Sequence, residues 1–441
     1  MQSLPDSFAP YTACPDCDLL LHKVVAQPGY SLLCPRCRRV LLRSTSASLS
    51  KVLALSIAGL LLYLPAISLP LMTFSSFGFS GSANILESIL NFYRNDYYFV
   101  SLMVLLSAIV FPFILLTTIF LISWQLTQKK YPGYLAAIFR LHLHLEEWAM
   151  IEVYLIGILV TIIKMSHTSE IEYHSGIFCF AGLVVMTLAI STVLDRDHFW
   201  DLIESKGQKE ETSLTGPQPD ESEHTAAEHG LILCHTCHKL SPESLENSPC
   251  PRCRSPLHQR KPQSLARTWA LVVTSAIFLA PANLLPIMEV DFLGIPDQST
   301  ILDGIIYFFQ DGSYFIGLII FTASILVPIF KIVGLLILLR ATQPQHCQFL
   351  RRKARLFRFI AFIGRWSMLD IFVIALLSVL VDFGFFTSIH TAPAATYFSL
   401  VVAATMLAAM TFDPRVIWDT CIPDFSKNTQ TTPTPPLGKT L

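Results

Sequence analysis

Long apolar runs alternate with short polar segments along most of this chain, and the pattern predicts membrane-spanning helices. Eight runs approach the ~20 residues that a helix needs to cross the hydrocarbon core of a bilayer. They cover residues 52–74, 99–124, 148–165, 177–194, 269–290, 314–339, 366–381 and 395–412. We therefore expect an all-α membrane protein with eight spans, four in each half of the chain.

The two halves carry the same motifs, which indicates an internal duplication. LYLPAISLPLM in the first half matches FLAPANLLPIM in the second at an offset of 216 residues. After the loop that follows the second span the offset becomes 218, so that Trp148 and Glu152 match Trp366 and Asp370. Because each repeat holds an even number of spans, the repeats are expected to be parallel rather than inverted.

Eight of the eleven cysteines form four C-x-x-C pairs, two ahead of each set of spans. Two such pairs can place four thiolates in the tetrahedron that zinc prefers, which is the arrangement of a zinc ribbon. Rubredoxin-type iron uses the same ligands, and a redox dithiol needs only one pair. Since both pairs occur in both repeats, we predict two structural zinc ions, with iron as the alternative. The expected ligands are Cys14, Cys17, Cys34, Cys37, Cys234, Cys237, Cys250 and Cys253.

These features divide the chain into six segments. We predict zinc ribbons at 1–49 and 231–260, and four-span membrane units at 50–200 and 261–423. A polar, acidic stretch at 201–230 is expected to be a flexible linker, and 424–441 a disordered tail, because neither composition can bury a core.

Charge sets the expected orientation in the membrane. The loop 340–365 holds seven Lys and Arg side chains, whereas the loop 291–312 holds four Asp and no Lys or Arg. By the positive-inside rule, both termini and both ribbons face the cytosol. Only 14% of residues are charged and the net charge is −1, so nothing favours nucleic acid as a partner. No phosphate-binding loop or catalytic triad is visible, and we expect no enzyme activity.

Lys331 lies inside the sixth predicted span, where a lone ammonium costs several kcal/mol unless it faces a partner or a wet cavity. Asp370 is the carboxylate best placed in a neighbouring span. Ser324 shares a helix face with Lys331, and Ser367 shares one with Asp370. With Thr405 in the last span, Ser324, Lys331, Ser367 and Asp370 form the candidate transport and proton network. A structural ion pair, or a lysine that snorkels to the surface, is the alternative interpretation.

The first half provides an internal comparison for this network. The matching positions hold Ala108, Leu115, Ala149, Glu152 and Thr187. Only the carboxylate and the threonine persist, so Glu152 and Thr187 are weaker candidate site residues. The fold therefore tolerates loss of the lysine and the serines, so the second half retains three polar side chains that the fold itself does not require.

Two cysteine ribbons, each followed by four spans that begin with an LPxxxLPxM motif, resemble the paraquat-inducible protein A family. Its two-module members include the lipophilic envelope-spanning tunnel protein A. The resemblance covers about residues 10–425, and the five network positions match the polar network of the tunnel-A type.

The resemblance implies a multi-pass protein of the bacterial inner membrane that moves phospholipid. It implies a periplasmic partner with mammalian-cell-entry (MCE) domains that builds a tunnel toward the outer membrane, and it suggests a proton-driven mechanism. Two rival interpretations stay open: a membrane redox protein that uses its four-cysteine centres, and a scaffold that only anchors the tunnel protein.

Overall fold

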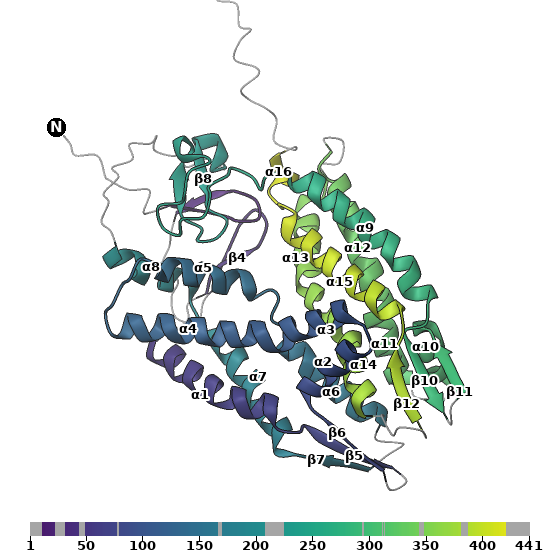
Figure 1. Cartoon of the computed structure of the whole chain (residues 1–441). Helices are drawn as coiled ribbons and strands as arrows, with labels where there is room; N and C mark the ends of the chain where they lie inside the picture. The colour runs from purple at the N-terminus through teal and green to yellow at the C-terminus, as the bar shows by residue number, and fades with distance from the viewer. Residues whose placement is uncertain are drawn as a thin grey trace, which may run out of the picture.

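The computed structural model shows two helical halves, with two small ribbons at one end and two β-sheets at the opposite end (Figure 1). The described residues are 11–22, 31–43, 49–76, 79–165, 170–207, 225–292, 295–310, 312, 314–343, 348–380 and 387–419. Most of the predicted linker, from 208 to 224, and the predicted tail lie outside them. The first seven residues assigned to the linker, 201–207, continue a helix.

The first half runs from purple through blue to teal in Figure 1. Its strands are β1 (Tyr11–Ala13), β2 (Leu20–His22), β3 (Ser31–Leu33), β4 (Val40–Arg43), β5 (Met72–Ser76), β6 (Phe79–Ala83) and β7 (Glu170–Tyr173). Its helical segments are α1 (Leu49–Ser68), α2 (Ile85–Arg94), α3 (Tyr98–Val104), η1 (Leu105–Val110), α4 (Phe111–Thr127), α5 (Leu135–Leu145), α6 (Ile151–Met165), α7 (Ser175–Val193) and α8 (Arg196–Gly207).

The second half repeats this order. Its strands are β8 (Leu231–Leu233), β9 (Leu240–Pro242), β10 (Met288–Phe292), β11 (Ile295–Ser299) and β12 (Thr387–Thr391). Its helical segments are η2 (Ala227–His229), η3 (Glu243–Leu245), α9 (Ser264–Leu284), α10 (Ile301–Gln310), α11 (Tyr314–Phe321), η4 (Thr322–Leu326), α12 (Val327–Arg340), α13 (Leu350–Gly364), η6 (Arg365–Met368), α14 (Leu369–Leu380), α15 (Ala394–Thr411) and α16 (Val416–Asp419).

The first span of each half ends earlier than its apolar run predicts. Helix α1 stops at Ser68 and α9 at Leu284, whereas the predicted spans reached 74 and 290. Pro70 and Pro286 explain the early end, because a proline drives the preceding residue out of the helical region. Leu285 has an extended ψ of 156°. The chain then continues into β5 and β10.

The predicted all-α class needs a correction, because the chain is mostly helical but carries two three-stranded sheets. Strand β5 pairs antiparallel with β6 and β7, and β10 pairs antiparallel with β11 and β12. Each sheet joins the loop after the first span to the strand before the fourth. The sequence did not predict these strands, because they are short and the apolar runs of the predicted spans extend into them.

Seven helices among the described residues are long and apolar enough to cross a membrane. They are Leu49–Ser68, Tyr98–Thr127, Ser175–Val193, Ser264–Leu284, Gly317–Arg340, Leu350–Val379 and Ala394–Thr411. Seven such helices fit a multi-pass membrane protein. Helix α6 stands where the third span was expected, but its 15 residues fall short of that length. An eighth span therefore stays a prediction.

The two halves meet where α6 packs against α14, their matching helices. A Cβ at Gly157 would stand 3.2 Å from Phe372 Cβ, so glycine permits the close approach. The ring of Tyr154 lies 5.0 Å from that of Phe372. Asn91 Nδ2 on α2 donates to the Ser378 carbonyl at 3.0 Å. One continuous core thus crosses the boundary between the repeats.

Each second span contains a π-helical turn, η1 or η4, directly ahead of a proline. Pro112 and Pro328 occupy the second helical position after these turns. A proline ring collides with the carbonyl four residues earlier, and a widened turn relieves that collision. The turn η4 carries Ser324, so the proline helps to place one residue of the candidate network.

Candidate functional site

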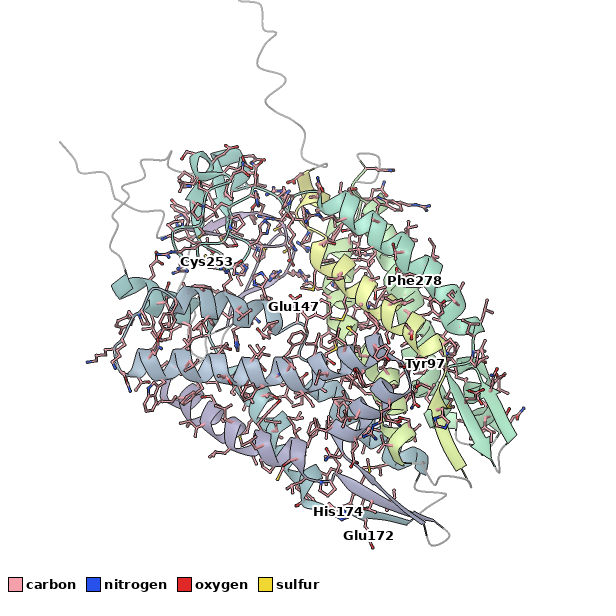
Figure 2. The ribbon with its side chains drawn as sticks, in the orientation of Figure 1. Tyr97, Glu147, Glu172, His174, Cys253 and Phe278 are labelled. Carbon is pink, nitrogen blue, oxygen red and sulfur yellow. The ribbon has the colours of Figure 1, made fainter. Side chains whose placement is uncertain are left out.

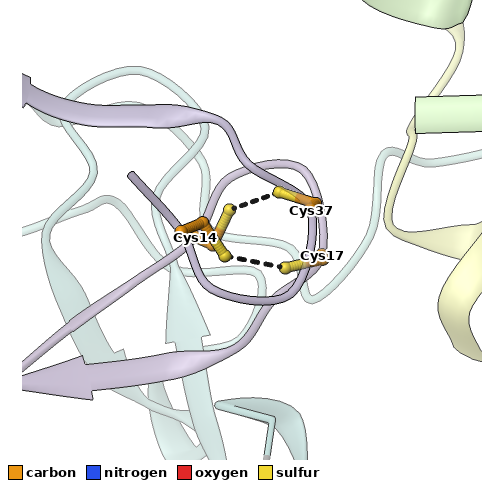
Figure 3. A group of neighbouring side chains, drawn as sticks. Cys14, Cys17 and Cys37 are labelled. Carbon is orange, nitrogen blue, oxygen red and sulfur yellow. Dashed lines mark hydrogen bonds between the residues drawn. The ribbon is translucent and has the colours of Figure 1, made fainter. Parts of the chain in front are cut away.

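Each set of four cysteines converges on one point. Sγ–Sγ distances are 3.4 Å for Cys14–Cys37 and 3.6 Å for Cys17–Cys34 (Figure 3). In the second ribbon they are 3.5 Å for Cys234–Cys253 and 3.6 Å for Cys237–Cys250. All four sulfurs of each set lie within 4.8 Å of one another and are buried. A tetrahedral ion with bonds of ~2.3 Å needs such spacing, so both sets can hold a metal.

Four identical turns build these sites. The residue after the second cysteine of each pair has a left-handed φ of 53–60°: Asp18, Arg38, His238 and Arg254. Its amide donates to the carbonyl of the first cysteine, as from Asp18 to Cys14 at 2.8 Å. The turn aims both thiols inward. Hydrogen bonds among the four sulfurs shift their pKa values in opposite directions. The largest of these bonds involves Cys14, and they lower the pKa of the Cys34 thiol and raise the pKa of the Cys17 thiol.

Each ribbon contacts a helix of the other half of the chain, an arrangement that we call exchanged docking. Arg358 of α13, in the second half, donates to Asp16 Oδ2 at 2.8 Å and to the Cys37 carbonyl at 3.0 Å in the first ribbon. Its repeat counterpart, Arg140 of α5, donates to the Cys253 carbonyl of the second ribbon at 3.3 Å. Cys253 lies beside α5 at the ribbon end (Figure 2). Each ribbon thus docks on the membrane unit of the other repeat.

Further contacts repeat this exchange. Arg252 in the second ribbon pairs with Asp201 and Glu204 of α8. Its counterpart Arg36 in the first ribbon stacks on Trp418, 4.6 Å from the ring centroid. The sequence duplication marks both arginines and both partner segments. Their crossed pairing is a tertiary fact that the duplication alone does not predict.

A buried cluster of charges joins the ribbons to the last span. Arg415 is fully buried and donates to both Asp413 oxygens at 3.1 Å and to His235 at 2.9 Å. Arg260 bridges Asp18 and Asp419. Burial alone would raise the pKa of Asp413, but Arg415 holds it at about 2. No local pattern in the sequence predicts this cluster, although Trp200-Asp201 and Trp418-Asp419 match at the repeat offset of 218 and Asp419 lies at its edge.

Within the membrane unit the structure brings together Lys331 and Ser367. Lys331 Nζ donates to Ser367 Oγ at 3.4 Å, from α12 to η6. The lysine is 0% exposed, so the interpretation as a snorkelling side chain is wrong. Among the described residues, no ion pair joins Lys331 to a carboxylate, and the serine hydroxyl accepts its hydrogen bond instead. Asp370 follows in the first turn of α14.

Two members of the candidate network bond within their own helices. Ser324 Oγ donates to the Ile320 carbonyl at 2.7 Å, and Thr405 Oγ1 donates to the Val402 carbonyl at 3.0 Å. Both hydroxyls are buried. Each keeps lone pairs that could accept a further hydrogen bond.

Four of the five first-half counterparts line a cavity of about 460 Å³. Leu115, Ala149, Glu152 and Thr187 all line it. In the first half a cavity thus lies beside Leu115, at the position where the second half carries the buried Lys331.

The chain matches the family model described as "Paraquat-inducible protein A" twice, at residues 49–204 and 265–421. It is 33% identical to "Intermembrane transport protein PqiA" of Escherichia coli K12 over 412 residues, 93% of this chain and 96% of the relative. It is 32% identical to "Lipophilic envelope-spanning tunnel protein A" of the same organism, over 93% of this chain and 91% of the relative. A "Probable intermembrane transport protein" of Haemophilus influenzae is 30% identical, over 92% and 95%. No solved structure matches. These relatives are named as transport proteins, not enzymes, and the chain belongs to the paraquat-inducible protein A family.

Proposed function

We propose that this protein is the inner-membrane subunit of an intermembrane lipid transport system. Its relatives are named for intermembrane transport and for an envelope-spanning tunnel. The observation that carries the proposal is the buried ammonium of Lys331, bonded to Ser367 on a neighbouring helix. Ionisable groups in such places mark ion or substrate pathways. Protonation of Asp370, coupled to Lys331 through Ser367, switches access to a lipid cleft.

The ribbons face the cytosol in this proposal. Helix α13, at the ribbon end, carries Arg351, Arg352, Lys353, Arg355 and Arg358. The opposite end carries the sheets and the acidic loop. This asymmetry supports the cytosolic placement of the ribbons and leaves the sheet end for a periplasmic MCE-domain partner. The short helix α6 completes the eighth span, in contact with α14.

Zinc in each four-cysteine set holds the ribbons folded, because domains this small cannot build a sufficient core. The exchanged docking then gives the ribbons a mechanical role. Since each ribbon contacts the opposite membrane unit through Arg358 or Arg140, the two units are braced at their cytosolic ends. A change in one half is thereby transmitted to the other.

Replacement of Lys331 tests the proposal. Lys331→Ala is expected to abolish complementation in cells that lack the endogenous protein, with expression and co-purification of the MCE partner unchanged. Ile337→Ala is the matched control, since that side chain lies on the same helix and is 47% exposed. Full complementation by Lys331→Ala would reject the network and favour the anchoring scaffold.

A further inference from the structure

The π-helical turn in each second span leaves one backbone carbonyl without a partner in its own helix. In η1 the Phe111 amide donates to the Leu106 carbonyl, five residues back. The next residue, Pro112, has no amide hydrogen, so the carbonyl five residues before it, that of Ser107, loses its partner within the helix. The repeat places the Ala323 carbonyl at the same position in η4. Such a carbonyl needs a partner from elsewhere, because an unpaired backbone group is costly inside a bilayer.

In the first unit, neighbouring segments donate to the carbonyls of the turn. The Met150 amide, directly before α6, donates to the Ser107 carbonyl at 3.3 Å. Two residues further along, the Ile109 carbonyl accepts a hydrogen bond of 2.7 Å from Tyr63 Oη of α1. Tyr63 is 6% exposed, so this bond is shielded from solvent. Both α1 and the start of α6 therefore hold η1 in place.

Helix α1 also approaches the second span closely just beyond the turn. It packs along α4 (Figure 1). A Cβ at Gly59 would stand 2.8 Å from Leu116 Cδ2, so glycine permits this approach. Gly59 lies about one helical turn before Tyr63. The close contact and the hydrogen bond thus fasten the same stretch of α1 to the second span.

The second unit lacks these fastenings. The repeat offset of 216 places Leu279 and Ser275 of α9 where α1 has its tyrosine and its glycine. Leucine has no hydroxyl to donate, and serine carries the Cβ that the close approach excludes. Among the described residues, no hydrogen bond from another segment reaches the carbonyl of Ala323 or that of Ile325. The backbone of η4 therefore relies on hydrogen bonds within its own span, whereas η1 is tied to its neighbours.

We propose that η4 is the hinge of the second membrane unit, at which α11 changes its angle to α12, while η1 keeps the second span of the first unit fixed. A helix bends most readily where a proline or a π-turn already interrupts its hydrogen bonds. Ser324 lies in η4 and Lys331 follows on α12, so the hinge adjoins the candidate network. The inference rests on the proposed transport function for the purpose of the movement, but the movement itself is measured without transport.

Distances between paired spin labels test this proposal. The full-length protein is reconstituted into vesicles of phosphatidylethanolamine and phosphatidylglycerol, with labels introduced as a non-canonical amino acid that leaves the cysteine sets intact. One pair replaces Ile277 of α9 and Leu318 of α11, which are 64% and 55% exposed. The matched first-unit pair replaces Leu61 and Leu102, which are 73% and 50% exposed. We expect two distances for the second-unit pair and one narrow distance for the first-unit pair.

Transfer of the tyrosine between the repeats supplies the decisive variants. Leu279→Tyr gives α9 the missing hydroxyl and should shift the second-unit pair about fivefold toward a single distance, since one hydrogen bond changes an equilibrium by roughly that factor. Leu279→Phe adds the ring without the hydroxyl and should keep both distances. In the opposite direction, Tyr63→Phe preserves the packing of α1 and should broaden the distance of the first-unit pair.

Each outcome has a definite meaning. A single distance for both unmodified pairs, or equal distances in Leu279→Tyr and Leu279→Phe, overturns the proposal. An unchanged first-unit distance in Tyr63→Phe also overturns it, even where Leu279→Tyr does not fold. The transport proposal is judged separately by complementation with Lys331→Ala. Two distances in the second unit with a fully active Lys331→Ala would reject transport while the hinge stands, and a single distance with an inactive Lys331→Ala would reject the hinge alone.

Discussion

The exchanged ribbons make a quantitative prediction about Arg358→Ala. The guanidinium makes two bonds to the first ribbon, to Asp16 Oδ2 at 2.8 Å and to the Cys37 carbonyl at 3.0 Å. The Asp16 side chain is 0% exposed and keeps Arg39 as a second partner. The substitution therefore weakens the docking of the first ribbon on α13 without leaving a buried charge alone.

The two bonds set the expected magnitude. A hydrogen bond to a charged group contributes about 1.5–3 kcal/mol and one to a neutral carbonyl about 1 kcal/mol. Loss of both should cost about 3 kcal/mol, or roughly 100-fold in the equilibrium for undocking. Arg140 makes one longer bond, 3.3 Å to the Cys253 carbonyl. Arg140→Ala should cost only about 1 kcal/mol, and it should act on the second ribbon.

Amide hydrogen exchange measures this effect, because protection reports local opening. Arg358→Ala should speed exchange in residues 31–43 roughly 100-fold and leave residues 231–260 unchanged. Arg355→Ala removes the same charge from an exposed position on α13 and should change neither ribbon. Faster exchange in the second ribbon, or in neither, would show that the ribbons are not held by the opposite repeat.

Two further predictions concern the metal and a buried histidine. If the four-cysteine sets hold structural zinc, elemental analysis should find about two zinc ions per chain with no visible absorbance, and chelation should expose α5 and α13 to proteolysis together; a red iron centre would support the redox alternative. Burial holds the folded-state pKa of His142 at about 4, below its usual 6.5. Its neutral form therefore contributes stability that is complete above pH 6.5 and is lost as the pH falls toward 4, by about 3 kcal/mol in total. Thermal unfolding of His142→Gln should show a weaker pH dependence in that window, and identical profiles would contradict the assignment.

The sequence alone was enough for features that local chemistry fixes. Four C-x-x-C pairs predicted both four-cysteine sets, because a knuckle is built within a few residues. The apolar runs predicted most of the membrane helices, since a span must bury its own backbone groups. The apolar run around Lys331 marked that side chain as a candidate site residue, and the duplication identified Leu115 as its first-half counterpart.

Only the tertiary structure decided how these parts combine. The crossed docking of the ribbons depends on which surfaces meet, and both repeats carry the same arginines, so the sequence could not choose between self-docking and exchange. The partner of Lys331 depended on how α12 packs against the neighbouring helices, and the hydrogen bond goes to Ser367. The cavity exists because side chains distant in sequence fail to fill a space, and no local pattern records an absence of that kind. Hydrophobic periodicity determines which face of each helix is buried, whereas contacts between helices determine which neighbour that face packs against.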